Sequence, residues 1–133
     1  MPVKLTPVIL FVRYFDRCLK FYEKVFGLEL KRLYRGKGHP PWAEFQVGDI
    51  RFALHAGYKG PAFRQWRPLA LHFDVKDIRR TLAKIKRYGG KIKQPIRKLD
   101  FRPEELQLAY AAAFADPDGN VFEVQQVLKK FRK

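Results

Sequence analysis

The sequence predicts an α+β fold made of two tandem βαβββ modules that form a curved mixed sheet around a groove. Three observations predict it. Strand-like runs flank two segments with helical periodicity, the order strand, helix, strands occurs twice, and the halves align when one is shifted by 63 residues. The aligned pairs are Val12 with Val75, Phe15 with Ile78, Leu19 with Leu82, Tyr22 with Ile85, and Gly27 with Gly90. Because a strand end, a helix face and a helix end fall in one register, we infer an internal duplication.

The first module begins with an apolar run at residues 8–12, which is typical of a buried strand. A helix is predicted next, with Asp16 as its N-cap and Gly27 as its C-terminal stop. Apolar residues repeat along it at helical spacing: Phe15, Cys18, Leu19, Tyr22, Val25 and Phe26. These residues are expected to form the buried face of the helix.

The rest of the first module is predicted to be three strands. Residues 28–34 alternate as a strand, and residues 36–41 form a loop rich in glycine and proline. Residues 42–47 and 50–56 then form a hairpin around a turn at Gly48. The predicted order is therefore β-α-β-β-β.

The second module repeats this order. A strand at residues 69–75 precedes a helix that Asp77 caps and that the glycines at 89–90 end. The apolar stripe of this helix is Ile78, Leu82 and Ile85. Strands are predicted at residues 91–95, 108–115 and 121–127, the last one after a turn at 116–120.

We expect one domain of 133 residues without a disulfide or a structural zinc site. The chain has one cysteine, Cys18, and no Cys/His cluster with zinc-ligand spacing. The predicted divisions are module 1 at about 3–56, a linker at 57–68, module 2 at about 69–128, and a basic tail at 129–133.

The composition limits which partners and which location are expected for the protein. The net charge is +15, which attracts polyanions such as nucleic acid; a heat-adapted, well-solvated surface is the alternative explanation. A basic stripe of Arg80, Lys84, Arg87 and Lys91 on the second helix supports either interpretation. No apolar run reaches the roughly 18 residues of a membrane span, and the N-terminus does not resemble a signal peptide, so a cytoplasmic protein is expected.

Alternation along the strands predicts which side chains line the groove. Side chains at i and i+2 share a face, and the helix covers only one face of each sheet. In the strand at 50–56 the helix-side set is Ile50, Phe52 and Leu54. The polar residues assigned to the opposite faces are Arg51, His55, His72, Asp74 and Glu123. A small-molecule site is expected there, because such sites are concave with a few polar groups.

Aromatic side chains are candidates for a second wall of the ligand site. Phe11, Trp42, Phe101 and Tyr110 offer flat surfaces for a planar ligand, although ordinary core packing is the commoner role of aromatic residues in a chain with 15% of them. The alanine-rich strand at 109–115 leaves space in front of it, or else allows a close contact with another sheet or chain.

Two segments resemble a known family. The strings FVRYFDRCLKFYEKVFGL at 11–28 and FADPDGNVFEV at 114–124 are similar to the vicinal oxygen chelate superfamily, which contains glyoxalases, bleomycin-resistance proteins and extradiol dioxygenases. The resemblance covers essentially the whole chain. It implies the paired βαβββ fold and a homodimer, but not one activity, because this fold supports many chemistries.

The resemblance also implies four metal-ligand positions, of which this chain keeps one. They fall on Pro7, Ala53, Ala70 and Glu123, and only Glu123 offers a donor. A divalent cation needs three or more protein donors, so no cofactor is expected at that site. The alternative is a displaced metal site of His55, His72 and Glu123, a set that suits iron or zinc.

The expected function is the binding of a small organic ligand in the groove without a metal. The charge of +15 favours an anionic or neutral ligand over a cationic drug. The predicted ligand-binding residues are His55, His72, Glu123, Arg51, Phe11, Trp42 and Tyr110, with Glu123 as the candidate catalytic base or, alternatively, as an ion-pair partner of Arg51. One alternative is a metal-dependent lyase, isomerase or dioxygenase that uses the displaced site, and another is a polyanion- or nucleic-acid-binding module.

Overall fold

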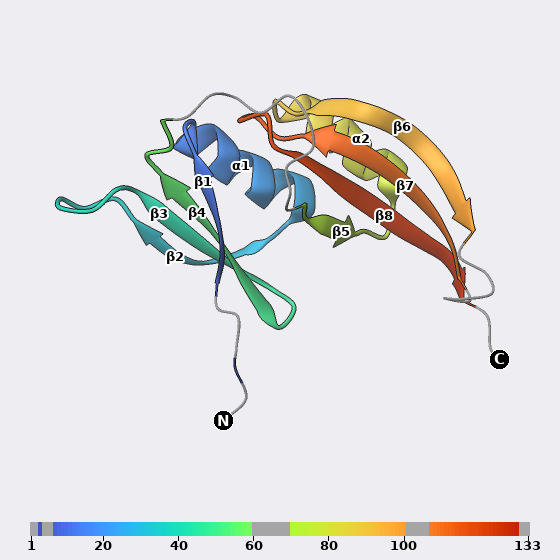
Figure 1. The fold of residues 1–133 in the computed structure, drawn as a ribbon, viewed down its shortest axis with the longest axis horizontal. Coiled ribbons are helices and arrows are strands. Elements are labelled where there is room, and N and C mark those ends of the chain that lie inside the picture. The colour runs from blue at the N-terminus through green and yellow to red at the C-terminus, as the bar shows by residue number, and fades with distance from the viewer. Residues whose placement is uncertain (1–2, 4–6, 60–69, 101–106, 131–133) are drawn as a thin grey trace. The chain divides into compact units, whose positions relative to one another are not determined.

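The chain divides into two compact units, Met1–Pro61 and Ala62–Lys133. The computed structural model describes residues 3, 7–59, 70–100 and 107–130. Most of the predicted linker, Phe101 and the last three residues of the predicted basic tail lie outside the described residues. In both units the order of elements is β-α-β-β-β, as the sequence predicts (Figure 1).

The first unit is a four-stranded sheet with one helix. Its elements are β1 (Val8–Val12), α1 (Phe15–Phe26), β2 (Glu29–Tyr34), β3 (Trp42–Val47) and β4 (Ile50–Ala56). The strand order is β1-β4-β3-β2, in which β1 and β4 are parallel and the other pairs are antiparallel. The helix α1 packs against β4.

The second unit repeats this topology. Its elements are β5 (His72–Asp74), α2 (Ile78–Arg87), β6 (Lys91–Asp100), β7 (Gln107–Ala115) and β8 (Val121–Lys130). The strand order is β5-β8-β7-β6, again with a parallel first pair. The helices begin at Phe15 and Ile78, the residues that the predicted duplication aligns, so the repeat in sequence corresponds to a repeat in structure.

The ends of α1 confirm one predicted cap and correct the other. Gly27 follows the helix at φ 62°, the left-handed conformation that a residue without Cβ adopts most easily. The N-cap is Tyr14, whose side chain makes no capping hydrogen bond, so the prediction of Asp16 as the cap is wrong. Asp16 lies in the first helical turn, where its carboxylate pairs with Arg35 at 2.6 Å.

The cap of α2 is as predicted. The side chain of Asp77 accepts a hydrogen bond from the backbone N–H of Arg80, three residues further on. Ile78 and Ile85 are buried beneath the helix together with Thr81, whose hydroxyl donates to the carbonyl oxygen of Asp77. This part of the predicted stripe is therefore confirmed, and Leu82 is only partly buried.

β5 and β6 differ from their predicted extent, and one residue of β4 differs from its predicted burial. β5 covers only His72–Asp74, and the predicted first residue of that strand is not among the described residues. β6 continues to Asp100 instead of ending at Pro95, with register shifts on either side of Gln94. In β4, Ile50 is 51% exposed at the end of the strand, so its predicted place in the core is wrong.

The turn before β8 is held by Asp116. Its carboxylate accepts hydrogen bonds from the backbone N–H groups of Asp118 and Asn120 and from the Asn120 side chain, each at 2.9 Å. Asp116 and Asn120 are both buried. These bonds fix the point at which β8 begins, at Val121, and hence the position of Glu123 two residues later.

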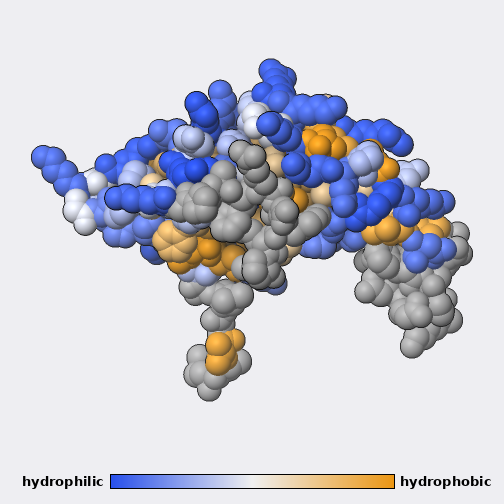
Figure 2. Space-filling view, turned by 45° about the horizontal axis from the view of Figure 1, so that its top comes forward, coloured by the Kyte–Doolittle hydropathy of each residue, from blue (hydrophilic) through white to orange (hydrophobic). Residues whose placement is uncertain are grey.

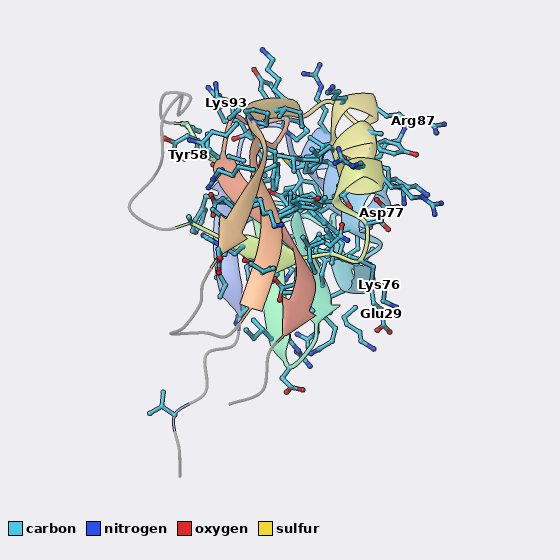
Figure 3. The ribbon with its side chains drawn as sticks, turned by 90° about the vertical axis from the view of Figure 1, so that its right-hand side faces the viewer. Glu29, Tyr58, Lys76, Asp77, Arg87 and Lys93 are labelled. Atoms are coloured by element: carbon cyan, nitrogen blue, oxygen red, sulfur yellow. The ribbon has the colours of Figure 1, made fainter. Side chains whose placement is uncertain are left out.

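The surface matches the strongly basic composition. Hydrophilic side chains dominate the face shown in Figure 2. Figure 3 labels Arg87 on α2 and Lys93 on β6 among the side chains at the periphery. Within the part of the chain that the structure describes, no helix is long and apolar enough to span a membrane.

Candidate functional site

A row of four rings crosses the sheet of unit 1. Tyr34, Trp42, His55 and Phe11 are consecutive register partners, one on each strand from β2 through β3 and β4 to β1. The His55 ring lies 4.6 Å from the Phe11 ring and 5.6 Å from the Trp42 ring, between centroids. The row faces away from α1: Phe52 contacts the helix residue Tyr22, and His55, three residues further along β4, points to the other side of the strand. We call the side of each sheet that faces away from its helix the open face.

The β2–β3 loop adds a fifth ring to this row. His39 lies 5.4 Å from His55 and 5.7 Å from Tyr34, between ring centroids. Beside these rings is a hollow of about 620 Å³ lined by Arg32, Leu33, Tyr34, His39 and Trp42. Its volume is in the range of small-molecule sites. The sequence predicted Phe11, Trp42 and His55 here, but it gave no partner to His39, because the loop conformation brings that ring to the sheet.

The next row on the same open face contains an ion pair between a buried carboxylate and a partly exposed arginine. Glu44 lies opposite Ala53 on β4, and its carboxylate pairs with Arg51 at 3.0 Å. The Glu44 side chain is 5% exposed. Arg51 therefore has its ion-pair partner within unit 1, and the sequence analysis missed Glu44. The available signal was a charged residue two positions after Trp42, on the same face of a strand whose other residues are mostly apolar.

On the open face of unit 2, the side chains of His72 and Arg97 both contact Glu123. His72 and Glu123 are direct register partners on the parallel strands β5 and β8, and the His72 Nδ1 is 3.3 Å from Glu123 Oε2. The Arg97 guanidinium on β6 donates to Glu123 Oε1 at 2.8 Å and to Gln94 Oε1 at 2.8 Å. The Glu123 side chain is 15% exposed and that of His72 is 58% exposed.

Arg97 is the functional candidate that sequence reasoning missed. The predicted strand ended at Pro95, and Arg97 lies two residues beyond it. In the structure β6 continues, and the register shift between Gln94 and Arg97 aligns Arg97 with Ala111 on β7. A shift of this kind depends on pairing between strands and leaves no local pattern in the sequence.

The structure places Tyr110 on the side of the sheet that faces α2. The Arg79 guanidinium of that helix lies 5.8 Å from the centroid of the Tyr110 ring. Gln126, the register partner of Tyr110, accepts from the N–H of Ile78 at the start of the same helix. The alternating alanines of β7 point the other way: Ala109, Ala111, Ala113 and Ala115. Tyr110 is therefore on the face opposite Glu123.

Within its described residues, neither unit presents a donor set that fits a divalent metal. Glu123 is the one donor that the family pattern keeps, and an arginine already occupies one of its oxygens. His72 adds a second donor, whereas His55 belongs to unit 1 and has its Nδ1 2.6 Å from the Ala56 carbonyl oxygen. Among the residues of known placement, no group of three His, Cys, Asp or Glu side chains is arranged to hold an ion. Three protein donors are the usual minimum for a bound ion.

The open faces of the two units differ in the chemistry that they can support. Unit 2 presents a carboxylate whose charge is balanced by Arg97, next to an imidazole that faces solvent. Such a pair can accept hydrogen bonds from a polar ligand and donate hydrogen bonds to it. Unit 1 presents rings and an arginine, which suit a flat ligand.

Comparisons with known proteins agree with this fold. A family model described as Glyoxalase/Bleomycin resistance protein/Dioxygenase superfamily matches residues 4–124. The probable chloroplastic lactoylglutathione lyase of Arabidopsis thaliana is 34% identical over 102 residues, which is 68% of this chain and 28% of the plant protein. The chain thus spans less than a third of that relative.

Solved structures give the same result for the fold. The fosfomycin resistance protein FosX from Mesorhizobium loti is 21% identical with a TM-score of 0.68, over 93% of this chain and 91% of that one. FosX from Listeria monocytogenes, complexed with Mn(II) and sulfate ion, is 17% identical with a TM-score of 0.68, over 95% and 93%. A glyoxalase family protein from Bacillus cereus reaches a TM-score of 0.76 at 15% identity, over 97% of both chains. The predicted fold class is confirmed.

Proposed function

We propose that this chain, which belongs to the Glyoxalase/Bleomycin resistance protein/Dioxygenase superfamily, binds a small anionic or neutral organic ligand without a divalent metal at Glu123. The proposal assigns the polar contacts with this ligand to His72 and Glu123 on the open face of unit 2. Glu123 is the group that would accept a hydrogen bond or a proton from the ligand.

The observation that carries the proposal is the contact between Arg97 and Glu123. The guanidinium donates to Glu123 Oε1 at 2.8 Å, so an ion bound to this carboxylate would lie close to a fixed positive charge. At an effective dielectric constant of about 20, two unit charges about 4 Å apart interact by about 4 kcal/mol, and the double charge of a Mn²⁺ ion doubles that repulsion. Two donors, His72 and Glu123, meet among the described residues of unit 2, and coordination by two groups does not offset a cost of this size.

The charge of the ligand follows from the same pair. Arg97 balances the charge of Glu123, so the carboxylate repels an anion less than a free one would. The net charge of +15 attracts anions over a longer range. The relatives' names supply suitable probes: lactoylglutathione, and the 1S,2S-dihydroxypropylphosphonic acid found with Mn(II) in an E126Q mutant of Listeria FosX.

The test is calorimetric titration of the full chain with S-lactoylglutathione and with 1S,2S-dihydroxypropylphosphonic acid in the presence of a chelator. We expect at least one of the two to bind, and Glu123→Gln to weaken that binding by about 10-fold or more, because a hydrogen bond to a charged group is lost. Glu29→Gln removes the same charge from an exposed carboxylate that pairs with Lys31, and it should leave the affinity unchanged.

A metal-dependent lyase, isomerase or dioxygenase is the rival, because a solved neighbour carries Mn(II). Titration of the chelated protein with Mn²⁺ distinguishes the two. The same weak Mn²⁺ binding for the native chain and for Glu123→Gln supports the proposal. Near-stoichiometric Mn²⁺ that the Glu123→Gln variant loses, or ligand binding that begins only after Mn²⁺ is added, overturns it, as does the failure of both probes to bind.

A further inference from the structure

The row of rings on unit 1 is exposed where a structural role would bury it. Phe11 is 47% exposed and Tyr34 is 42% exposed, although both lie in line with Trp42 and His55 on a sheet. Core packing accounts for the buried rings on the α1 side, such as Phe45. It does not account for a line of rings on the uncovered side, because large exposed apolar groups that are contiguous mark binding surfaces.

A positive charge, that of Arg32, lines the hollow beside this row. Among the residues that the structure describes, the Arg32 side chain makes no hydrogen bond or ion pair. Its neighbour across the strands, Glu44, is already paired with Arg51, so the nearby negative charge is balanced elsewhere. None of the described residues that line the hollow is acidic.

The remaining polar atoms around the hollow are largely committed. The Tyr34 hydroxyl donates to the carbonyl oxygen of Lys37 at 2.8 Å, and the His39 Nδ1 lies 2.6 Å from the carbonyl oxygen of Pro40. These contacts hold both rings at the β2–β3 loop, at one end of the sheet of unit 1 (Figure 1). The guanidinium is the cationic group that lines the hollow, and its two parallel N–H groups match a carboxylate.

We infer that this hollow of unit 1, lined by Arg32, Tyr34, His39 and Trp42, binds a planar aromatic anion of the aryl carboxylate class. The ring of the ligand stacks among the side-chain rings, and its carboxylate pairs with Arg32. The inference rests on the proposed function only in that the chain binds an organic ligand. It requires neither Glu123 nor His72, so the two proposals fail independently.

The test is calorimetric titration of the full chain with 2-naphthoate and with its neutral counterpart 2-naphthalenemethanol. We expect naphthoate to bind, and the neutral compound to bind at least about 10-fold more weakly, since it cannot form a charge-assisted pair with Arg32. Arg32→Ala should weaken naphthoate binding by about 10-fold, and Tyr34→Leu should weaken it by about 3-fold or more by removing a stacking surface. Both residues are exposed, so these variants should fold.

Arg80→Ala is the matched control, because it removes the same charge from an exposed position on α2. Salt screens the charge of an exposed residue that does not line the hollow, so this variant should change the naphthoate affinity by less than about 2-fold. The inference is overturned if naphthoate does not bind, if the neutral compound binds equally well, or if Arg32→Ala and Arg80→Ala have equal effects. Loss of naphthoate binding in Glu123→Gln with full binding in Arg32→Ala would place the ligand at the other site and would also overturn it.

Discussion

Two arginine–glutamate pairs lie on the open faces of the two repeated units, at positions that the duplication does not align. In unit 1 the carboxylate is on β3, as Glu44, and faces an alanine on β4. In unit 2 it is on β8, as Glu123, and faces Ala113 on β7. The two units therefore carry their arginine–glutamate pairs at different positions of the same strand topology. Each neutralises a largely buried carboxylate, because an unpaired charge at such a position is costly.

The burial of β4 gives a prediction at the scale of single residues. Leu54 is fully buried, whereas Ile50 is 51% exposed on the same side of the strand. Leu54→Ala should lower the free energy of unfolding by about 2–5 kcal/mol, since it leaves a cavity, and Ile50→Ala should lower it by no more than about 0.5 kcal/mol. Urea denaturation followed by circular dichroism measures both. Equal losses in the two variants would contradict the assigned burial.

At the scale of elements, the two helices begin in different ways although their sequences suggest the same device. Both segments have an aspartate near the predicted start, but only Asp77 caps its helix. The difference is one of position: Asp77 precedes the first helical residue, whereas Asp16 is the second residue of α1. A carboxylate there interacts with the helix dipole and with Arg35, but it does not close the first turn.

This difference predicts unequal effects of the same substitution. Asp77→Ala should lower the free energy of unfolding by about 1 kcal/mol, because the N–H of Arg80 loses its acceptor. Asp16→Ala removes an exposed ion pair and should cost less than about 0.5 kcal/mol. Chemical denaturation of both variants in one buffer provides the comparison, and a larger loss for Asp16→Ala would show that the sequence-based cap was correct after all.

The length of β6 is another property decided at the scale of elements. The predicted strand covered residues 91–95, and its last residue, Pro95, cannot donate to a strand ladder. The structure accommodates this residue between two register shifts and continues the strand to Asp100. That continuation places Arg97 beside Glu123. The positive charge that balances Glu123 therefore depends on the register shifts of β6.

At the scale of the whole molecule, the surplus of basic residues is the dominant electrostatic property. The net charge is +15, and the cations of α2 take no part in ion pairs within the described residues: Arg79, Arg80, Lys84, Lys86 and Arg87. Like charges at this density repel one another in the folded chain. Salt screens this repulsion more strongly as the Debye length falls.

We therefore expect added salt to stabilise the protein. Raising NaCl from about 0.01 M to about 0.15 M shortens the Debye length from about 30 Å to about 8 Å, and the urea midpoint should rise. The variant Arg80→Glu lowers the net charge by two and should show a smaller increase. A midpoint that stays constant or falls with salt would indicate that ion pairs outweigh repulsion in this chain.

The sequence by itself determined the repeated βαβββ order, the helix stop at Gly27, the cap at Asp77 and the face on which Glu123 lies. These features follow from local periodicity and from backbone preferences of single residues, which a sequence displays directly. The proposed ligand chemistry began there as well, with a charge that favours anions over cations.

Only the tertiary structure decided which groups those residues meet. The pairing of Arg97 with Glu123, of Arg51 with Glu44, and the position of His39 beside His55 depend on strand register and loop conformation. Register is set by hydrogen bonds between segments far apart in the chain, and a shift of one or two residues changes every partner. For this reason the sequence located the carboxylate, and the fold determined that an arginine neutralises it.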